Sequence, residues 1–296
     1  MARTWAVTLL VSVILVVTGA PCSPGGRTAA TRHQDETILV GWSRGSSTEV
    51  VGVWRRTAGW EDLLSLYERD AARVRSLVGA SRTWTLFRIG EKPVHMKTGR
   101  LGVRDTAGGD KLLQVGVTTP SIADDYEGLA VSGSSQMRAL PARRLPLEDP
   151  AAQQVVLQIL RGRGLSTGKV TLTQNYAVDL DRDGRSDQLC AAEVEIPEDR
   201  DGQRHSGCMI IALFRGPSEQ AAPTAVVVTE RTMKRLSEPV SPLGVLSVRL
   251  LAATTSPRSR RCTIAFAVAA RDYTGFELGT FARDGFKPAL LLEHGT

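Results

Sequence analysis

The second half of this chain is a succession of short apolar segments, each bounded by residues typical of turns, and this pattern limits the fold more than any other feature. Gly, Pro, Asn, Asp and Ser separate the segments at intervals typical of antiparallel sheets. Eight segments lie beyond Gly164, at 169–178, 188–196, 208–214, 224–229, 243–252, 262–269, 277–281 and 289–292. Four more precede them, at 38–42, 50–54, 83–89 and 111–117. The pattern predicts a protein built mainly from antiparallel sheets.

Two other segments have apolar residues at helical spacing. The first, about 60–78, repeats apolar residues every three or four positions and is followed by Gly79, a common C-terminal stop. The second, about 150–161, follows Asp149, which can cap the free N–H groups, and begins at Pro150, which suits the first helical position. We therefore predict an α+β, β-dominated fold of antiparallel sheets with two helices.

The N-terminus has a different composition. Arg3 is followed by an uncharged apolar run from Trp5 to Ala20. At about 1.5 Å per residue, a helix of this length falls short of a hydrocarbon core, so the run predicts a signal peptide rather than a membrane span. We expect a signal peptide at 1–22, a flexible polar tether at 23–37, a β-rich region with one helix at 38–148, and a β-rich region with an acidic loop at 149–296. The sequence leaves open whether the last two regions form one domain or two.

The end of the apolar run allows three fates. Thr18-Gly19-Ala20 places small residues where a signal peptidase reads them. Gly19-Ala20-Pro21-Cys22 also resembles the lipobox of bacterial lipoproteins, whose cysteine is lipidated, although Pro21 departs from that motif. An uncleaved N-terminal anchor is the third alternative. In each case we expect an exported protein that is periplasmic, membrane-tethered or extracellular.

The distribution of charge in the sequence does not favour a nucleic-acid partner, and we expect none. The chain has 37 Lys and Arg against 31 Asp and Glu, for a net charge of +6. The basic residues are dispersed and are not interleaved with aromatic residues that stack on bases. A mild attraction to anionic lipid or cell-wall polymer stays open, and the oligomeric state is not determined.

The cysteines allow at most one intramolecular disulfide once the N-terminus is processed. They are Cys22, Cys190, Cys208 and Cys262. If Cys22 is lipidated or removed, an oxidising compartment predicts one bridge and one buried thiol. A tight turn centred on Asp199 would place Cys190 opposite Cys208, at a separation that a disulfide can close. A longer loop would pair Ile196 with Cys208, and we favour this register because it keeps two apolar strands paired.

The sharpest local motif is the acidic stretch 178–187, VDLDRDGRSD. Carboxylates stand at loop positions 1, 3, 5 and 9, with a glycine at position 6 and a main-chain carbonyl at position 7. This pattern fits the oxygen ligands and high coordination number of Ca²⁺, and it favours Ca²⁺ over Mg²⁺ because it leaves few gaps for water. The expected metal ligands are Asp179, Asp181, Asp183, the backbone carbonyl of Arg185, and Asp187.

The loop resembles known calcium loops in part. It is similar to an EF-hand loop but departs from it at Ser186, where that family has an aliphatic residue, and at Cys190, where it has Glu. It more closely resembles the strand–loop–strand calcium loops of FG-GAP and VCBS-type repeats, over about a dozen residues, which does not imply a propeller. The alternative is a tight Asp/Gly turn whose charge Arg182 and Arg185 partly neutralise. A shorter copy at 198–202 lacks the later acidic residue and predicts a plain surface loop.

The remaining motifs favour a role without catalysis. The four histidines are isolated, and no His-Glu-x-x-His zinc motif occurs. We expect a non-enzymatic structural or ligand-binding protein with calcium as its cofactor. The alternative is an envelope hydrolase that uses dispersed carboxylates such as Asp124, Asp125 and Glu127. A deep pocket lined by two neighbouring carboxylates would favour the hydrolase.

Overall fold

The computed structural model describes residues 37–80, 83–106, 109, 111–118, 127–132, 137–164, 168–196, 205–214, 223–234, 247–255, 261–270 and 273–295. The chain divides into two units, Met1–Gln34 and Asp35–Thr296, and every described residue belongs to the second. The expected signal peptide with Cys22 and nearly all of the expected tether lie outside the described residues. Three helices and sixteen antiparallel strands are described, so the predicted α+β, β-dominated fold is confirmed.

The first sheet closes on itself. Its strands follow the order β1-β7-β4-β5-β6-β2, and β1 also pairs with β2, so these six strands form a ring, and β3 pairs with the end of β2 that β6 does not reach. Closure gives almost every strand two neighbours and leaves few unpaired edges. The strands are β1 (Thr37–Arg44), β2 (Ser47–Arg55), β3 (Gly59–Asp62), β4 (Thr83–Phe87), β5 (Val94–Asp105), β6 (Lys111–Thr118) and β7 (Glu127–Ser132).

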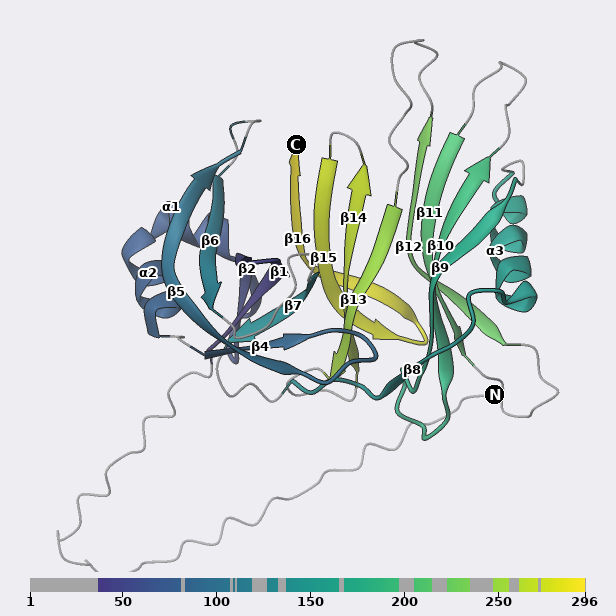
Figure 1. Ribbon diagram of the computed structural model, residues 1–296, viewed down its shortest axis with the longest axis horizontal. Coiled ribbons are helices and arrows are strands. Elements are labelled where there is room, and N and C mark those ends of the chain that lie inside the picture. The colour runs from purple at the N-terminus through teal and green to yellow at the C-terminus, as the bar shows by residue number, and fades with distance from the viewer. Residues whose placement is uncertain are drawn as a thin grey trace, which may run out of the picture. The chain divides into compact units, whose positions relative to one another are not determined.

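Two short helices share a core with the ring (Figure 1). Helices α1 (Leu63–Arg69) and α2 (Ala71–Ala80) occupy the region where one helix was expected at 60–78. The core draws its buried side chains from both helices and all six ring strands. These are Leu39, Val50, Val53, Leu63, Leu66, Val74, Val78, Trp84, Leu86, Met96, Leu113, Val115 and Ala130.

Aspartates divide this helical region. Asp62 accepts a hydrogen bond from the N–H of Ser65 at 2.7 Å and caps α1, so the preceding residues form β3 instead of helix. Asp70 ends α1 with a non-helical backbone conformation, and its carboxylate accepts from the N–H of Arg73 at 3.0 Å at the start of α2. Because a short carboxylate competes with the helix for its own N–H groups, each Asp starts a new helix here.

The second and third sheets are open. The second has the order β12-β11-β10-β9-β8 and the third has the order β13-β14-β15-β16. All eight segments predicted beyond Gly164 are strands of these sheets. The bounds are β8 (Ala142–Arg144), β9 (Val170–Val178), β10 (Asp187–Ile196), β11 (His205–Phe214), β12 (Thr224–Lys234), β13 (Ser247–Thr255), β14 (Cys262–Ala270), β15 (Tyr273–Ala282) and β16 (Gly285–Gly295).

Helix α3 (Pro150–Gly162) covers the outer face of the second sheet and matches the predicted helix. Asp149 caps it through a hydrogen bond from the N–H of Ala152 at 3.1 Å, and Pro150 stands in the first turn. Ala152, Val156 and Leu160 are buried in the core that α3 shares with β9, β10 and β11. Burial raises the pKa of Asp149, but the hydrogen bonds from Ala152 and Gln188 outweigh it, so the pKa is lowered overall.

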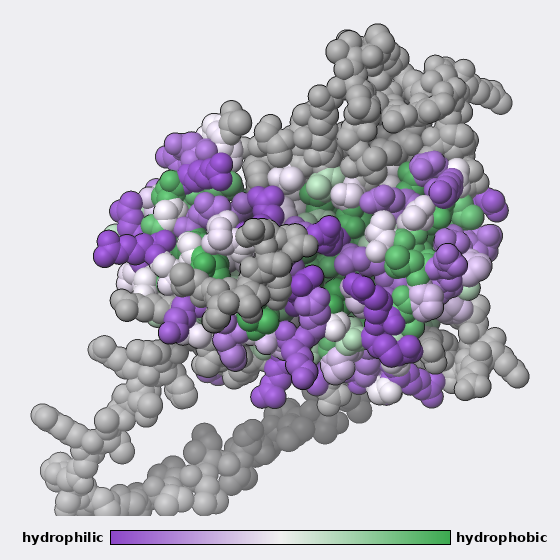
Figure 2. All heavy atoms as spheres, viewed as in Figure 1, coloured by the Kyte–Doolittle hydropathy of each residue, from purple (hydrophilic) through white to green (hydrophobic). Residues whose placement is uncertain are grey.

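The third sheet lies between the ring and the second sheet (Figure 1). One of its faces shares a core with the ring, in which Phe276 stacks on Trp42. The other face shares a core with the second sheet, in which Phe281 stacks on Phe214. Figure 2 shows hydrophilic residues gathered on the side of the described surface where β5, β6, α1 and α2 lie.

The expected disulfide is wrong: Cys190, Cys208 and Cys262 all carry thiol groups. In the observed register Glu193 pairs with Cys208 and Ile196 pairs with His205, so neither expected register occurs. Cys190 lies three residues from the partner of Cys208, about 10 Å along the ladder. Because that offset is odd, the two thiols lie on opposite faces of the sheet, one under α3 and the other toward the third sheet. Burial raises the pKa of the Cys190 thiol to about 12.

Candidate functional site

The acidic loop connects β9 to β10 and is anchored by buried residues. Leu180 and Asp187 are both buried, and the N–H of Leu180 donates to Asp187 Oδ2 at 3.0 Å. Between them, Arg182 and Gly184 have φ angles of 61° and 87°, in the left-handed region that tight turns use. These anchors and the tight turn hold the loop carboxylates in fixed positions.

Three of the four aspartates predicted as metal ligands converge. One carboxylate oxygen from each of Asp179, Asp181 and Asp187 lies within 4.8 Å of the other two. Oxygens that share one Ca²⁺ lie about 2.3–2.6 Å from it, and therefore within about 5 Å of one another. The spacing of these three oxygens fits a shared cation.

The fourth aspartate is engaged elsewhere. Asp183 Oδ1 accepts from the N–H of Arg185 at 2.8 Å, so Asp183 and Arg185 bond to each other within the turn. Main-chain N–H groups of Asp183 and Gly184 in turn donate to the two oxygens of Asp179 at 3.1 and 3.0 Å. Such bonds stabilise a turn whether or not a cation is bound, which keeps the plain-turn alternative open.

Arg283 neutralises part of the loop charge from a distant part of the sequence. It lies in the two-residue turn between β15 and β16, and its Nε donates to Asp181 Oδ2. A second nitrogen of its guanidinium donates to Asp183 Oδ2 at 3.3 Å, and the group lies over the ring of Phe214. The bond to Asp181 raises the pKa of Arg283. From the sequence alone only Arg182 and Arg185 were expected in this role, because Arg283 reaches the loop through the packing of the third sheet against the second.

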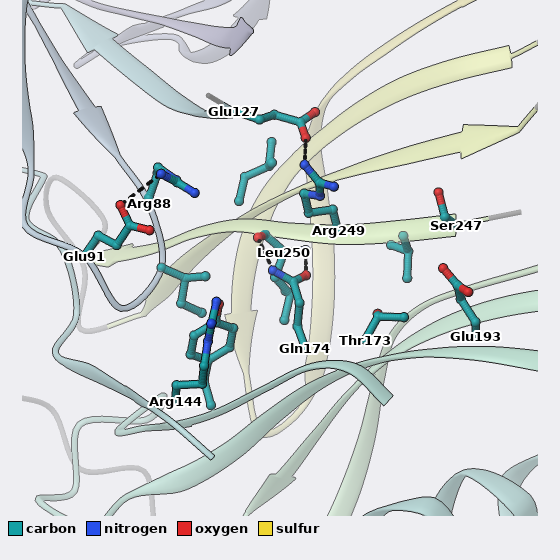
Figure 3. A pocket seen from close by; sticks show the side chains of 14 residues that line it. Arg88, Glu91, Glu127, Arg144, Thr173, Gln174, Glu193, Ser247, Arg249 and Leu250 are labelled. Carbon is teal, nitrogen blue, oxygen red and sulfur yellow. Dashed lines mark hydrogen bonds and ion pairs between the residues drawn. The ribbon is translucent and has the colours of Figure 1, made fainter. Parts of the chain in front are cut away.

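A polar cavity of about 460 Å³ lies where the three sheets meet, and it is the second candidate site (Figure 3). Its walls come from the β4–β5 connection, the start of β7, three strands of the second sheet, and β13. The lining residues are Arg88, Ile89, Glu91, Glu127, Arg144, Thr173, Gln174, Tyr176, Glu193, Ser247, Val248, Arg249, Leu250 and Leu251. No sequence motif marks this site, because six separate segments of the chain build it.

Two ion pairs occupy four of the six charged residues in the cavity. Arg88 pairs with Glu91 at 3.1 Å, and Arg249 pairs with Glu127 at 2.8 Å. Figure 3 shows both pairs on the side of the cavity formed by the ring and β13. Within each pair the two charges cancel, which leaves one arginine and one glutamate of the cavity outside these ion pairs.

The remaining charges are Arg144 on β8 and Glu193 on β10. The guanidinium of Arg144 hydrogen bonds to the phenol of Tyr176, which raises the pKa of Arg144. Glu193 has no ion pair or side-chain hydrogen bond within the described part of the chain, and burial raises its pKa. The cavity therefore presents one charge of each sign that forms no ion pair among the described residues, although the negative charge of Glu91 also raises the pKa of Arg144.

The carboxylates proposed for a hydrolase are not brought together by the described residues. Asp124 and Asp125 lie outside them. Glu127 lines the cavity, but its Oε1 accepts from the indole N–H of Trp42 and its Oε2 from Arg249, both at 2.8 Å. Both oxygens of Glu127 are thus used for structural bonds.

Two Gly-x-Ser-x-Gly sequences, at 41–45 and 164–168, do not have the context of a nucleophile elbow. Such an elbow places its serine between a strand and the following helix. Ser43 instead lies buried in the β1–β2 hairpin, where its Oγ accepts from Thr48 at 3.1 Å. The second sequence follows α3 and precedes β9, the reverse order, and Ser166 lies outside the described residues.

Comparisons with known proteins do not assign this chain to a family. No family model, no curated protein and no solved structure matches this chain. Among the described residues, no helix has both the length and the apolar character needed to cross a membrane. The second acidic copy at 198–202 lies outside the described residues.

Proposed function

We propose that this chain is an exported, non-enzymatic protein of the cell envelope, with a structural or ligand-binding role and one calcium-binding loop. The observation that carries the calcium part is the convergence of Asp179, Asp181 and Asp187 within 4.8 Å. The export part is supported by the apolar run from Trp5 to Ala20.

The acidic loop connects two strands and contacts a turn of another sheet. It joins two neighbouring strands of the second sheet and touches the β15–β16 turn of the third sheet through Arg283. A cation bound to Asp179, Asp181 and Asp187 would hold the strand ends of β9 and β10 together. It would also remove the repulsion that three neighbouring carboxylates otherwise exert on one another. Calcium therefore acts in this proposal as a stabiliser of the fold.

The test is the thermal stability of the purified protein in millimolar calcium and in excess chelator. Binding only to the folded state adds about 2.7 kcal/mol at a hundredfold excess over the dissociation constant, so calcium should raise the melting temperature. Asp181→Asn should blunt that rise, because it removes one charged ligand while keeping the size of the side chain. Magnesium should produce a smaller rise than calcium, since it requires a tighter octahedral shell.

Two further variants make the calcium test specific. Asp284→Asn changes an exposed aspartate that pairs with Lys287 in the neighbouring turn, and it should leave the calcium response unchanged. Arg283→Gln removes the internal cation beside Asp181, and it should lower the melting temperature in chelator and enlarge the rise with calcium. Identical melting curves of the wild-type protein in calcium and chelator would mean that Arg283 alone balances the loop, and would refute the proposal.

A further inference from the structure

We propose that the polar cavity binds a short extended peptide by its two charged ends, with the peptide carboxylate at Arg144 and its amino group at Glu193. This inference deepens the ligand-binding role proposed above and does not depend on calcium. It follows from the charges that line the cavity, from the spacing between Arg144 and Glu193, and from the main-chain groups that face the cavity.

The charges of the cavity match a ligand that carries both signs. Of its three arginines and three glutamates, two of each pair with one another, which leaves Arg144 and Glu193. Figure 3 shows Arg144 and Glu193 on opposite sides of Gln174, so the two charges stand at different ends of the cavity. An anion alone would leave Glu193 without a partner, and a cation alone would leave Arg144 without one. A zwitterion satisfies both groups.

The spacing sets the length of the ligand. On β9, Tyr176 is the register partner of Arg144 and Thr171 is that of Glu193, which is 176 − 171 = 5 residues along the strand. At about 3.3 Å per residue and two strand spacings of about 4.8 Å, the two Cα atoms lie roughly 19 Å apart. Side chains that extend into the cavity shorten this gap, so a chain of about four residues, at about 3.4 Å each, fits between them. A single amino acid is too short.

The main chain of β13 favours a peptide over other zwitterions. β13 is an edge strand, and the side-chain amide of Gln174 donates to the carbonyl of Leu250 at 3.1 Å and accepts from its N–H. The main-chain groups of Leu250 therefore point away from β14. Because this direction alternates with a period of two, the N–H and carbonyl of Val248 point to the same side and line the cavity. A peptide backbone supplies the complementary donor and acceptor, as in recognition by strand addition.

The state of Glu193 also fits a binding site better than a purely structural position. Three arginines line the same cavity, yet none is bonded to Glu193 among the described residues. Burial of this unpaired carboxylate disfavours its ionised form. Residues held in such a state cluster at functional sites.

The test is calorimetric titration of the purified protein with tetra-alanine, in parallel with N-acetyl-tetra-alanine and tetra-alanine amide. Free tetra-alanine should bind, and blocking either end should weaken binding about tenfold or more, the usual cost of losing a charge-assisted hydrogen bond. Glu193→Gln should lower the affinity for free tetra-alanine to the affinity that the wild-type protein has for N-acetyl-tetra-alanine, and it should leave the affinity for the N-acetyl peptide unchanged. Arg144→Gln should lower the affinity for free tetra-alanine to the level of tetra-alanine amide and leave the affinity for the amide unchanged.

Matched variants separate binding from folding. Glu195→Gln and Arg143→Gln change exposed neighbours on the same two strands that do not line the cavity, and they should leave the affinity unchanged. Because Glu193→Gln removes an unpaired, partly buried charge, its melting temperature should not fall, so a loss of binding cannot reflect unfolding. No binding of tetra-alanine at millimolar concentration, or equal affinity for the free and blocked peptides, would overturn the inference. A calcium response that persists in that case leaves the calcium proposal standing.

Discussion

The acidic loop and the polar cavity bring charged side chains together in opposite ways. The loop gathers like charges from nine consecutive residues, 179–187, and receives one arginine from elsewhere. The cavity gathers equal numbers of opposite charges from six segments and leaves one of each sign without a charged partner. Asp187 in the loop is buried and hydrogen-bonded, whereas Glu193 in the cavity is partly buried and is not.

This difference indicates what each carboxylate contributes. A buried carboxylate with main-chain donors stabilises the fold, because removing it leaves those donors unpaired. A partly buried carboxylate without donors destabilises the fold slightly, and groups in this state are more common at functional sites than elsewhere. The sign of the stability change on mutation therefore distinguishes the two regions.

The largest effect is expected at Asp187. Asp187→Ala leaves the buried N–H of Leu180 without its acceptor and should lower the free energy of unfolding by about 2 kcal/mol, measured by urea denaturation in chelator. Asp187→Asn keeps an oxygen in the same place and should cost less. Equal losses for the two variants would show that charge, and not the bond to Leu180, is what the position requires.

A second carboxylate with main-chain donors calibrates that result. Asp149→Ala should lower stability by about 1 kcal/mol at pH 7, the usual loss on removing a helix N-cap. Since hydrogen bonds lower the pKa of Asp149, its contribution is present above the unfolded value of about 3.9 and is lost as pH falls through the folded value. Urea midpoints at pH 7 and pH 2.5 measure this, and an undiminished difference in acid would contradict the ionised cap.

The smallest effect, of opposite sign, is expected at Glu193. Burial raises its pKa, so the folded state holds the proton more tightly and is most stable below the unfolded pKa of about 4.3. That stability is lost as pH rises through the folded pKa. Glu193→Gln should therefore raise the free energy of unfolding by less than about 1 kcal/mol at pH 7, because solvent screens a partly exposed group. In acid, where Glu193 is protonated, the substitution should leave the free energy of unfolding unchanged. A loss of stability at pH 7 would remove the contrast with Asp187.

Most strands were predictable because their side chains alternate between core and solvent or run through a core. The strands missed were β3, β5, β7 and β8. In β5 only Met96 is buried, so no apolar pattern marks that segment. β3, β5 and β8 are held by main-chain bonds to adjacent strands, and a local pattern does not reveal such bonds. β7 is different, because Leu129, Ala130 and Val131 form a short buried apolar run that the sequence does show.

The acidic loop could be recognised from sequence because its aspartates lie close together in the chain. The spacing of Asp179, Asp181 and Asp187 is set by a turn of nine residues, and the structure brings one carboxylate oxygen of each within 4.8 Å of the others. Asp183 was expected to join them but bonds to Arg185 and Arg283. Arg283 lies 100 residues away from Asp183 and reaches the loop only because the third sheet packs against the second.

The sequence by itself determined the antiparallel β-rich class, the helix at 150–162 with its Asp149 cap, and the acidic turn, because each rests on interactions between residues close in the chain. Tertiary structure alone decided the closed ring, the register that separates Cys190 from Cys208, and the cavity between Arg144 and Glu193. These depend on which strands become neighbours, and that choice is made by the burial of whole sheet faces against one another.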